Sequence, residues 1–289
     1  MNQLPIVFRN QAISRRRERF RSLHSSGCFV IPNPWNVGSA RYLQHLGFSA
    51  LATTSAGFAF SKGLPDSDAA ISRARSLAYI AEIADAVEVP VSADFGGGYG
   101  VRPEDVAESV RLCVATGVAG LSIEDSTGDR SVPLYELPLA VERVRAARRA
   151  IDEAGGGVLL TARAECFHVG HPQALRESVQ RVQAYAAAGA DVLFAPGLQR
   201  AEEIKTLVDA VWPRPLNVLI VRDIGLNVSQ LAALGVRRVS VGGALALTAW
   251  GGFMRAARAL SAEGSFGGFT DAASYGELND LFEADWRER

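Results

Sequence analysis

The sequence is poor in lysine and has no excess of charge of either sign. Only Lys62 and Lys205 are lysines among its 30 basic residues, and 31 acidic residues leave a formal net charge of -1. Nucleic acids and anionic membranes favour strongly basic surfaces, so this balance argues against both. We therefore expect neither a nucleic-acid partner nor a membrane partner.

Cysteine is scarce and widely spaced. Cys28, Cys113 and Cys166 form no CxxC pair or other zinc-like spacing, which is typical of a protein from a reducing cytoplasm. The first 24 residues contain no apolar core of signal-peptide length. The uncharged stretch Val239–Met254 has 16 residues, fewer than the roughly 20 that a membrane helix needs. The sequence predicts a cytoplasmic protein.

Two common motifs of enzyme sites are missing. The glycines at positions 96, 97, 98 and 100 do not have the GxGxxG spacing of a dinucleotide-binding loop. Ser55 does not lie in a GxSxG elbow, which argues against a serine hydrolase. These absences disfavour a nucleotide-binding open sheet and a hydrolase of the serine class.

A helix-like segment that ends at a glycine and continues at once into an apolar run occurs four times. The runs are LGFSALATT at Gly47, TGVAGLSIED at Gly117, AGADVLFAPG at Gly189 and LGVRRVSVGG at Gly235. A glycine at a helix end can adopt the left-handed conformation and turn the chain back into a sheet. The repeat predicts alternating helices and strands.

Four further strand-like runs lack this glycine entry. They are CFVI, VEVPVSA, GGVLLTA and PLNVLIV. All eight runs are apolar on both faces, as parallel strands covered by helices are, and segments such as 103–115 and 172–188 are long enough for helices. Eight such units predict a (β/α)8 TIM barrel. A doubly wound open sheet is the alternative.

No linker-like segment interrupts the pattern, so we expect a single barrel domain over residues 1–289. Residues 1–24 are expected to form a basic helix outside the barrel, capped near Ser14, with a solvated or subunit-contacting surface. Residues 244–289 contain two more apolar helical segments than barrel closure requires. We expect these C-terminal helices to pack against another subunit.

Charged residues gather where the predicted strands end. Barrel enzymes carry their chemistry on the loops after the strand C-termini, and those positions hold Asp94, Glu124, Asp125, Arg163, Glu165, Arg222 and Asp223. Carboxylates with an arginine can hold a hard cation and an anionic substrate. The alternative is that each carboxylate caps a helix or pairs with a neighbouring arginine. Asp94, Glu124 and Arg163, taken as a set, favour the site.

The other candidates are weaker. His168 and His171 follow the fifth strand, but two histidines do not make a transition-metal site, so we interpret them as surface or substrate-loop residues. Cys166 has no histidine partner that the sequence fixes, and a buried, unreactive thiol is the simpler interpretation. Glu165 and His168 are both candidates for a proton donor on position alone.

Five stretches between Ile31 and Gly243 carry a resemblance to a known family. They read NPWNVGSARYLQHLGFSALATTSAG, GLPD, DFGGGYG, GLSIED and TARAE. In order and spacing they resemble the isocitrate lyase and phosphoenolpyruvate mutase superfamily. The resemblance implies a barrel of the phosphoenolpyruvate/pyruvate type, dependence on Mg2+ with Mn2+ as an alternative, and a small-molecule carboxylate substrate related to the 2-oxo acids. It also implies a homodimer or homotetramer in which the last helix is exchanged between subunits.

The resemblance assigns roles to individual residues. Asp94 corresponds to the direct metal ligand, and Asp66 and Glu124 correspond to ligands that act through water. Arg163 corresponds to the residue that faces the substrate oxygens. Asp94, Glu124 and Arg163 are thus the expected catalytic residues. The substrate carboxylate is expected to bind the TTSAG segment through Thr53, Ser55, Ala56 and Gly57.

The chain departs from the family pattern in two places. The metal loop of the family usually reads DxDxGYG or DxExGYG, whereas Gly96 stands in the position of the second acid. After Asp125 the chain has STGDRSVPLY, where lyases of the family carry a Lys-Lys/Arg-Cys-Gly-His loop and mutases an Asn-Ser pair. The first departure predicts weaker metal binding or a water in the empty place. The second argues against isocitrate or methylisocitrate cleavage by the usual thiol mechanism, and against phosphonomutase activity.

The sequence therefore predicts a Mg2+-dependent lyase that cleaves a C-C bond in a small 2-oxo or 2-hydroxy carboxylic acid through an enolate. Decarboxylation of a substrate such as oxaloacetate is compatible with the shorter loop, because it needs less acid or base assistance. Two alternatives stay open. One is P-C bond chemistry on phosphonopyruvate or carboxyphosphonoenolpyruvate, and the other is a catalytically weak protein that binds 2-oxo acids.

Overall fold

The chain divides into two compact units. The computed structural model describes residues 6–287, and the boundary between the units lies between Gly243 and Ala244. The first unit carries all the strands and the candidate site, and the second consists of helices only.

Eight parallel strands form a nearly closed barrel in the first unit. They are β1 (Phe29–Ile31), β2 (Leu51–Ala52), β3 (Val91–Asp94), β4 (Gly120–Glu124), β5 (Leu159–Arg163), β6 (Val192–Phe194), β7 (Leu216–Leu219) and β8 (Arg238–Ser240). Their order is β1-β8-β7-β6-β5-β4-β3-β2. At the seam between β1 and β2, the backbone N–H of Ala52 donates to the carbonyl of Pro32 at 3.0 Å. The predicted (β/α)8 TIM barrel is confirmed, and the open sheet is excluded.

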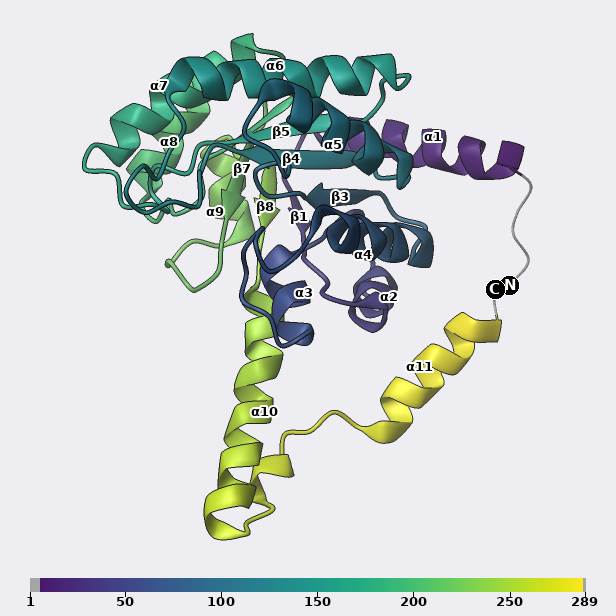
Figure 1. The fold of residues 1–289 in the computed structure, drawn as a ribbon. Helices are drawn as coiled ribbons and strands as arrows, with labels where there is room; N and C mark the ends of the chain where they lie inside the picture. Colours follow the sequence, from purple (N-terminus) through teal and green to yellow (C-terminus); the bar gives the residue numbers. More distant parts are fainter. Residues whose placement is uncertain (1–5, 288–289) are drawn as a thin grey trace. The chain divides into compact units, whose positions relative to one another are not determined.

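Helices connect successive strands on the outside of the barrel (Figure 1). They are α2 (Val37–His45), α3 (Ser55–Ser61), α4 (Arg73–Ala86), α5 (Pro103–Ala115), α6 (Leu137–Glu153), α7 (Ala174–Ala187), α8 (Ala201–Val211) and α9 (Val228–Ala233). The helix predicted over 103–115 coincides with α5, and the segment 172–188 contains α7.

Four helix-to-strand turns have the backbone conformation that the repeated glycine predicts. Gly47, Gly117, Gly189 and Gly235 have φ angles of +85°, +89°, +104° and +95°. Residues with a side chain are strained in this left-handed region, and glycine is not. The N–H of each glycine donates to a carbonyl in the last turn of the preceding helix, so the predicted turn is confirmed at all four positions.

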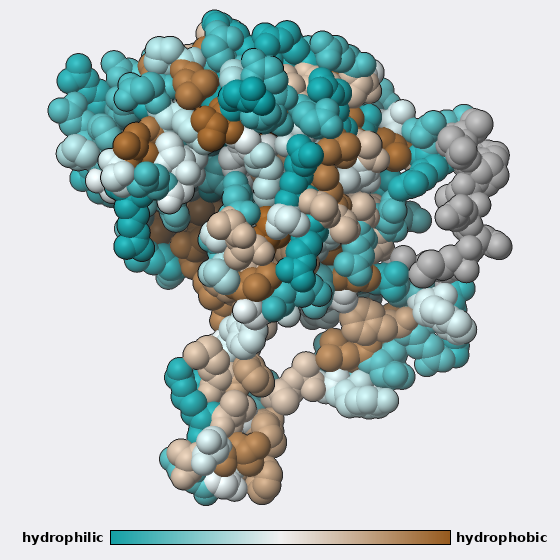
Figure 2. Space-filling view, in the orientation of Figure 1, coloured by the Kyte–Doolittle hydropathy of each residue, from teal (hydrophilic) through white to brown (hydrophobic). Residues whose placement is uncertain are grey.

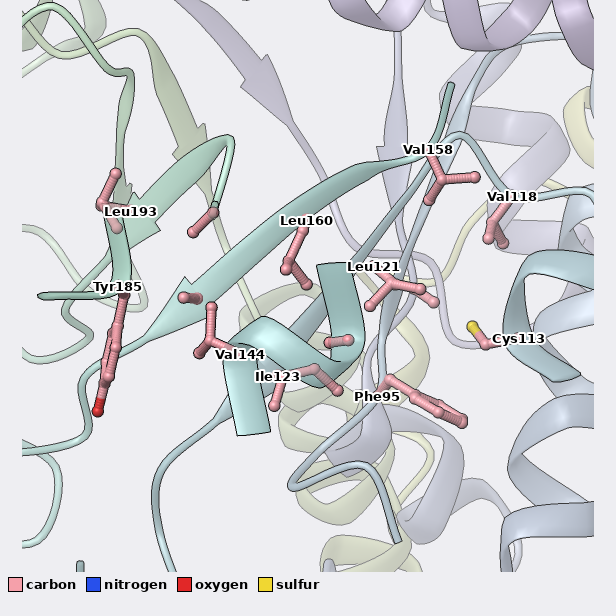
Figure 3. Packing of buried hydrophobic residues seen from close by; sticks show 14 of the residues in the cluster. Phe95, Cys113, Val118, Leu121, Ile123, Val144, Val158, Leu160, Tyr185 and Leu193 are labelled. Carbon is pink, nitrogen blue, oxygen red and sulfur yellow. The ribbon is translucent and has the colours of Figure 1, made fainter. Parts of the chain in front are cut away.

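The main core lies between the strands and the helices that cover them. Figure 3 shows Ile123 of β4 and Leu160 of β5 near Val144 of α6, and Phe95 after β3 is fully buried in the same cluster. Successive side chains of a strand point to opposite faces. Because Phe95 and Ile123 face the helices, the neighbouring Asp94 and Glu124 face the barrel interior.

The second unit is formed by α10 (Ala244–Glu263), the short 3-10 helix η1 (Gly267–Phe269) and α11 (Tyr275–Arg287). Large apolar side chains of this unit lie on its surface (Figure 2), among them Phe253, Phe266 and Trp286, which are 61%, 69% and 74% exposed. The predicted exchange of C-terminal helices between subunits requires such a surface. That exchange and the single-domain organisation stay predictions. No helix within the described residues has both the length and the apolar character needed to cross a membrane.

The N-terminal helix α1 (Ile6–Leu23) packs against the barrel instead of presenting only a solvated surface. Phe20 is fully buried in a cluster with Ala119 and Leu159 at the N-terminal ends of β4 and β5. The guanidinium of Arg17 donates to the Val118 carbonyl at 3.1 Å. The basic residues of this helix therefore serve partly as donors to the backbone at the N-terminal end of the barrel.

The predicted helix cap near Ser14 is wrong. The helix is continuous from Ile6, and the Ser14 hydroxyl donates to the Asn10 carbonyl at 3.0 Å. This bond to the carbonyl four residues earlier is typical of a serine inside a helix. The arginine-rich segment on both sides continues the helix because arginine is a good helix former.

His24 follows α1 and is buried between aromatic rings. Its ring lies 4.7 Å from that of Phe20 and 5.0 Å from that of Phe29, and Nδ1 is 2.8 Å from the Phe20 carbonyl. Burial, assisted by the charge of Arg238, lowers the pKa of His24 to about 3, although the hydrogen bond to Phe20 opposes the change. His24 is therefore neutral in the folded protein at ordinary pH.

This burial predicts acid sensitivity. Between pH 6.5 and pH 3 the unfolded chain binds a proton at His24 that the folded chain excludes, so the free energy of unfolding falls as pH falls, by up to about 1.4 kcal/mol per pH unit. Replacement His24→Gln removes the titrating group and should make the slope shallower. Urea unfolding of both proteins between pH 6.5 and pH 4 measures the slopes, and equal slopes would contradict this assignment.

Candidate active site

Three of the predicted site residues are the last residues of neighbouring strands. Asp94 ends β3, Glu124 ends β4 and Arg163 ends β5. The parallel register places Glu124 directly opposite Arg163, and Asp94 opposite Ser122. The structure therefore brings together, at the C-terminal mouth of the barrel, the residues predicted to be catalytic.

Arg163 contacts three carboxylates at once. Its Nη1 donates to Asp94 Oδ1 at 3.0 Å, its Nη2 lies 3.5 Å from Glu124 Oε2, and its Nε donates to Glu165 Oε1 at 2.7 Å. The guanidinium also lies over the ring of Phe194, 5.0 Å from its centre. The planar fork of arginine suits such pairing better than the single ammonium of lysine does. Arg163 thus fixes the carboxylates of two strand ends and of the loop after β5 relative to one another.

Asp94 is held by the segment that follows β2. The backbone N–H and the hydroxyl of Ser55 both donate to Asp94 Oδ2 at 3.0 Å. The Thr53 hydroxyl accepts from the backbone N–H of Asp94 at 2.8 Å, and Thr53 itself is fully buried. In this arrangement Ser55 and Thr53 position Asp94, and their predicted role in binding substrate stays a prediction.

Ser55, Ala56 and Gly57 form the first turn of α3. The cap of this helix is Thr54, whose side chain accepts from the Gly57 N–H at 3.2 Å. Gly57 therefore already has a hydrogen-bond partner for its N–H. The predicted role of Ala56 and Gly57 in holding a substrate carboxylate stays a prediction.

The loop between α3 and α4 carries two carboxylates near Asp94. Asp66 was predicted as a metal ligand, whereas Asp68 is not among the residues predicted from the motifs. Both residues are exposed. Asp68 lies two residues after Asp66 in the stretch GLPDSD. The sequence signal that could have identified Asp68 is therefore this second acid, just outside the GLPD motif.

Asp68 borders the space that the missing acid would fill. A Cβ atom built on Gly96 would stand 3.0 Å from Asp68 Oδ1 and 3.6 Å from Glu124 Oε1. A Cβ atom built on Gly97 would stand 3.9 Å from Asp68 Oδ2. The carboxylate of Asp68 therefore lies against the glycine loop, beside Glu124.

Burial and mutual repulsion raise the pKa of three acidic side chains at the mouth, Asp66, Asp68 and Glu124. For Asp66 and Asp68 partial burial has the largest effect on the pKa, and the charge of Asp94 adds to it. Burial raises the pKa of Glu124 to about 8, although Arg163 lowers it. Burial alone would lower the pKa of Arg163, but its acidic neighbours, Glu124 first, raise it overall. The cluster holds more negative charge than one arginine balances.

This excess of carboxylate oxygen is the donor chemistry that a hard cation such as Mg2+ prefers. Within residues 6–287, no three carboxylate, histidine or cysteine side chains are arranged to enclose a metal ion, and Arg163 lies between Asp94 and Glu124. Glu165 is fully buried, and its Oε2 has no hydrogen-bond partner in the described part of the chain. Such an atom indicates a missing polar partner. The carboxylate oxygens of Asp66, Asp94 and Glu124 have the chemistry that a divalent cation prefers, and Arg163 pairs with two of these carboxylates in the structure.

The DFGGGYG loop is held in an unusual conformation by a buried arginine. Tyr99 has a φ of +57°, which is rare for a residue with a side chain and costs of order 1–3 kcal/mol. Arg143 of α6 donates to the carbonyls of Gly97, Gly100 and Val101 and stacks on the Tyr135 ring, 4.1 Å from its centre. Arg143 lies within an arginine-rich helix, and no local sequence signal separates it from its exposed neighbours.

Asp125 has a structural role. It accepts from the Glu165 N–H at 2.8 Å, the Tyr185 hydroxyl at 2.6 Å and Arg181 at 3.1 Å, and it is buried. Asp125 therefore follows the alternative prediction for strand-end carboxylates, because it pairs with an arginine, Arg181. It fixes the backbone that carries Glu165.

The remaining candidates lie on the loop after β5. Cys166 is buried, and burial raises the pKa of its thiol to about 11, so the interpretation as an unreactive thiol fits the structure. His168 is exposed. The Nδ1 atom of His171 accepts from the backbone N–H of Gln173 at 3.2 Å, a contact within the loop. Neither Glu165 nor His168 is singled out as the proton donor, and both stay candidates.

Comparison with known proteins agrees with the motifs. The family model described as phosphoenolpyruvate phosphomutase matches residues 20–261. A solved structure from Burkholderia cenocepacia, described only broadly as a lyase/mutase, is 45% identical and has a TM-score of 0.89. It covers 94% of this chain and 97% of its own.

Two curated relatives extend the comparison. An uncharacterized protein of Mycobacterium tuberculosis is 34% identical over 224 residues, which are 77% of this chain and 81% of the relative. An oxaloacetate decarboxylase of Bradyrhizobium diazoefficiens is 28% identical over 206 residues, which are 69% of each chain.

The contacts of Arg143 predict a large loss of stability when it is replaced. In Arg143→Met the carbonyls of Gly97, Gly100 and Val101 lose their donor, and each unpaired buried carbonyl costs about 1–3 kcal/mol. We expect the free energy of unfolding, measured by urea denaturation in EDTA, to fall by at least about 2 kcal/mol.

The same helix offers a matched control. Arg145 is exposed and pairs with Glu142 on the surface, so Arg145→Met should change stability by no more than about 0.5 kcal/mol. Equal losses in the two variants would mean that the contacts of Arg143 do not hold the loop.

Proposed function

Because the chain belongs to the phosphoenolpyruvate phosphomutase family, within the isocitrate lyase/phosphoenolpyruvate mutase superfamily of lyases and mutases, we propose that it is a Mg2+-dependent carbon-carbon lyase. Its substrate is a small 2-oxo or 2-hydroxy carboxylic acid, and its reaction passes through an enolate. Decarboxylation of oxaloacetate is the reaction that we favour. The single observation that carries the proposal is the contact of Arg163 with Asp94, Glu124 and Glu165 at the mouth of the barrel.

Asp94, Glu124 and Asp66 are the residues that would hold Mg2+, with Mn2+ as an alternative. A divalent cation there would supply extra positive charge for the enolate oxygen. Asp94 is already oriented by the N–H and hydroxyl of Ser55. Arg163 donates to Asp94 in the structure, so the cation and Arg163 would have to share the Asp94 carboxylate.

Substrate binding falls to the groups that face the same mouth. Arg163 provides a fixed guanidinium for the oxygens of a 2-oxo acid. Ser55 offers a hydroxyl and a backbone N–H, and Ala56 follows it in the first turn of α3, so this turn is the place for the substrate carboxylate. The hydroxyl and N–H of Ser55 donate to Asp94, and the Gly57 N–H donates to Thr54, so Ser55 and Gly57 would have to share these donors with a substrate carboxylate.

The reaction itself needs little from the protein beyond charge. Loss of CO2 from oxaloacetate breaks the bond between C3 and C4, and the electron pair moves into the enolate of pyruvate. The guanidinium of Arg163 stabilises that negative charge because it is fixed before the charge develops. One proton is then added to C3 to give pyruvate. Glu165 and His168 are the candidate donors, with bulk water as the ultimate source.

The loop after β4 favours decarboxylation over thiol-assisted cleavage. Residues 126–135 form a compact hairpin, in which Ser126 pairs with Leu134 and the Thr127 N–H donates to the Pro133 carbonyl at 3.0 Å. This segment contains neither cysteine nor histidine. Cleavage of a larger hydroxy-tricarboxylic acid needs an acid that this loop does not carry, whereas loss of CO2 does not.

P-C bond chemistry is the second candidate, favoured by the description of the matching family model. Arg163 could bind a phosphonate as well as a carboxylate. The segment after Asp125, STGDRSVPLY, lacks the Asn-Ser pair of the mutases, so we rank this reaction below decarboxylation.

The first functional prediction concerns oxaloacetate. With Mg2+ the protein should release pyruvate and CO2, and EDTA should abolish the activity. Asp94→Asn keeps the size of the side chain but removes its charge, so kcat/KM should fall at least about 100-fold. A coupled assay for pyruvate measures both effects.

Asp209 provides the control. It pairs with Lys205 on the exposed surface of α8, so Asp209→Asn should leave kcat/KM unchanged. Activity that is indifferent to EDTA and to Asp94→Asn would exclude the proposed mechanism. Thermal stabilisation by oxaloacetate and Mg2+ without turnover would identify a binding protein instead.

The second functional prediction concerns phosphonates. Incubation with phosphonopyruvate and Mg2+ should leave the phosphorus NMR spectrum unchanged, because the mutase residues are missing from the loop after Asp125. If a phosphate ester or inorganic phosphate appears, the function is P-C bond chemistry and not decarboxylation.

A further inference from the structure

The space beside Gly96 is occupied by a carboxylate from another part of the chain. Gly96 lies in the loop after β3, whereas Asp68 lies in the loop between α3 and α4. The point where a Cβ of residue 96 would stand is 3.0 Å from Asp68 Oδ1 and 3.6 Å from Glu124 Oε1. An acid at position 96 would therefore place its oxygens in the region that Asp68 now fills.

The surroundings of Asp68 fit a cation site better than a structural contact. Its negative neighbours are Asp66 and Asp94, and its positive neighbour is Arg143, whose donors already serve the carbonyls of Gly97, Gly100 and Val101. Asp94 is paired with Arg163, whereas Asp66 and Asp68 are exposed, and a cation bound beside them would relieve the repulsion among the three carboxylates.

We infer that Asp68 supplies, from the loop before α4, the carboxylate that the cation site lacks at position 96. This inference rests on the proposed function, because it concerns the same Mg2+ site. Asp68 is a positioning residue: it adds negative charge and acceptor oxygens around the ion and the waters bound to it. Gly96 leaves room for the Asp68 carboxylate because it has no side chain.

The two positions compete for the same space. With Asp68 in place, a side chain at position 96 would meet Oδ1 at 3.0 Å, and an acid there would add like-charge repulsion. Without Asp68 the space is open. Gly96 has a φ of +53°, a conformation that aspartate and asparagine adopt more readily than most residues with a side chain. An acid can therefore be moved from position 68 to position 96.

The test is a swap of the carboxylate between the two positions, with Mn2+ as the probe. Asp68→Ala should weaken Mn2+ binding, measured by titration of the free ion in electron paramagnetic resonance, by about 10-fold to 100-fold. Adding Gly96→Asp to Asp68→Ala should restore most of the affinity. Adding Gly96→Asn, which has the same size but no charge, should not restore it.

A second readout needs neither metal nor activity. In EDTA, Asp68→Ala should raise the melting temperature, because it removes one of the clustered negative charges, whereas loss of a structural contact would lower it. A lower melting temperature in EDTA, or equal Mn2+ affinity in Asp68→Ala and the parent protein, overturns the inference. So does a failure of Gly96→Asp to restore binding.

The titration of Asp94→Asn separates this inference from the proposed function. If Asp94→Asn abolishes Mn2+ binding and Asp68→Ala does not change it, the proposed site stands and the role of Asp68 is wrong. If neither replacement changes the affinity, the metal site itself is wrong and both proposals fall.

Discussion

The structure of the site depends on the charge balance around Arg163. One guanidinium contacts carboxylates from β3, β4 and the loop after β5, and it is the one cation that ion-pairs with these acids in the described part of the chain. Asp66 and Asp68 add further negative charge nearby. Charges removed from water are tolerated only when they are paired. The geometry of the mouth is thus set by Arg163, and the remaining negative charge supports the proposed binding of a cation.

The barrel places these charged side chains at its mouth because successive side chains of a strand point to opposite faces. Phe95 and Ile123 are packed into the core under the helices (Figure 3), which turns Asp94 and Glu124 inward to the mouth. The same packing anchors the ends of the DFGGGYG loop, and Arg143 fixes its middle through backbone carbonyls. Core and site are therefore coupled, because the residues that bury the strands also set the direction of the charged ones.

The sequence predicts the features that depend on local pattern. The left-handed glycine at the end of a helix, the apolar run and the charged strand end each lie within a few residues, so Gly117, Glu124 and Arg163 could be placed without a structure. Asp68 and Arg143 could not, because their roles arise from proximity to a loop that lies far away in the sequence. The packing of α1 against the barrel through Phe20 is missed for the same reason.

In the inferred site the second acid is Asp68, and position 96 carries no side chain. Position 96 lies in a loop whose backbone is clamped by Arg143 and carries the strained Tyr99, so a ligand there would be rigid. Asp68 instead lies on an exposed segment between α3 and α4. The inferred site therefore takes its second acid from a part of the chain that the contacts of Arg143 with the glycine loop do not hold.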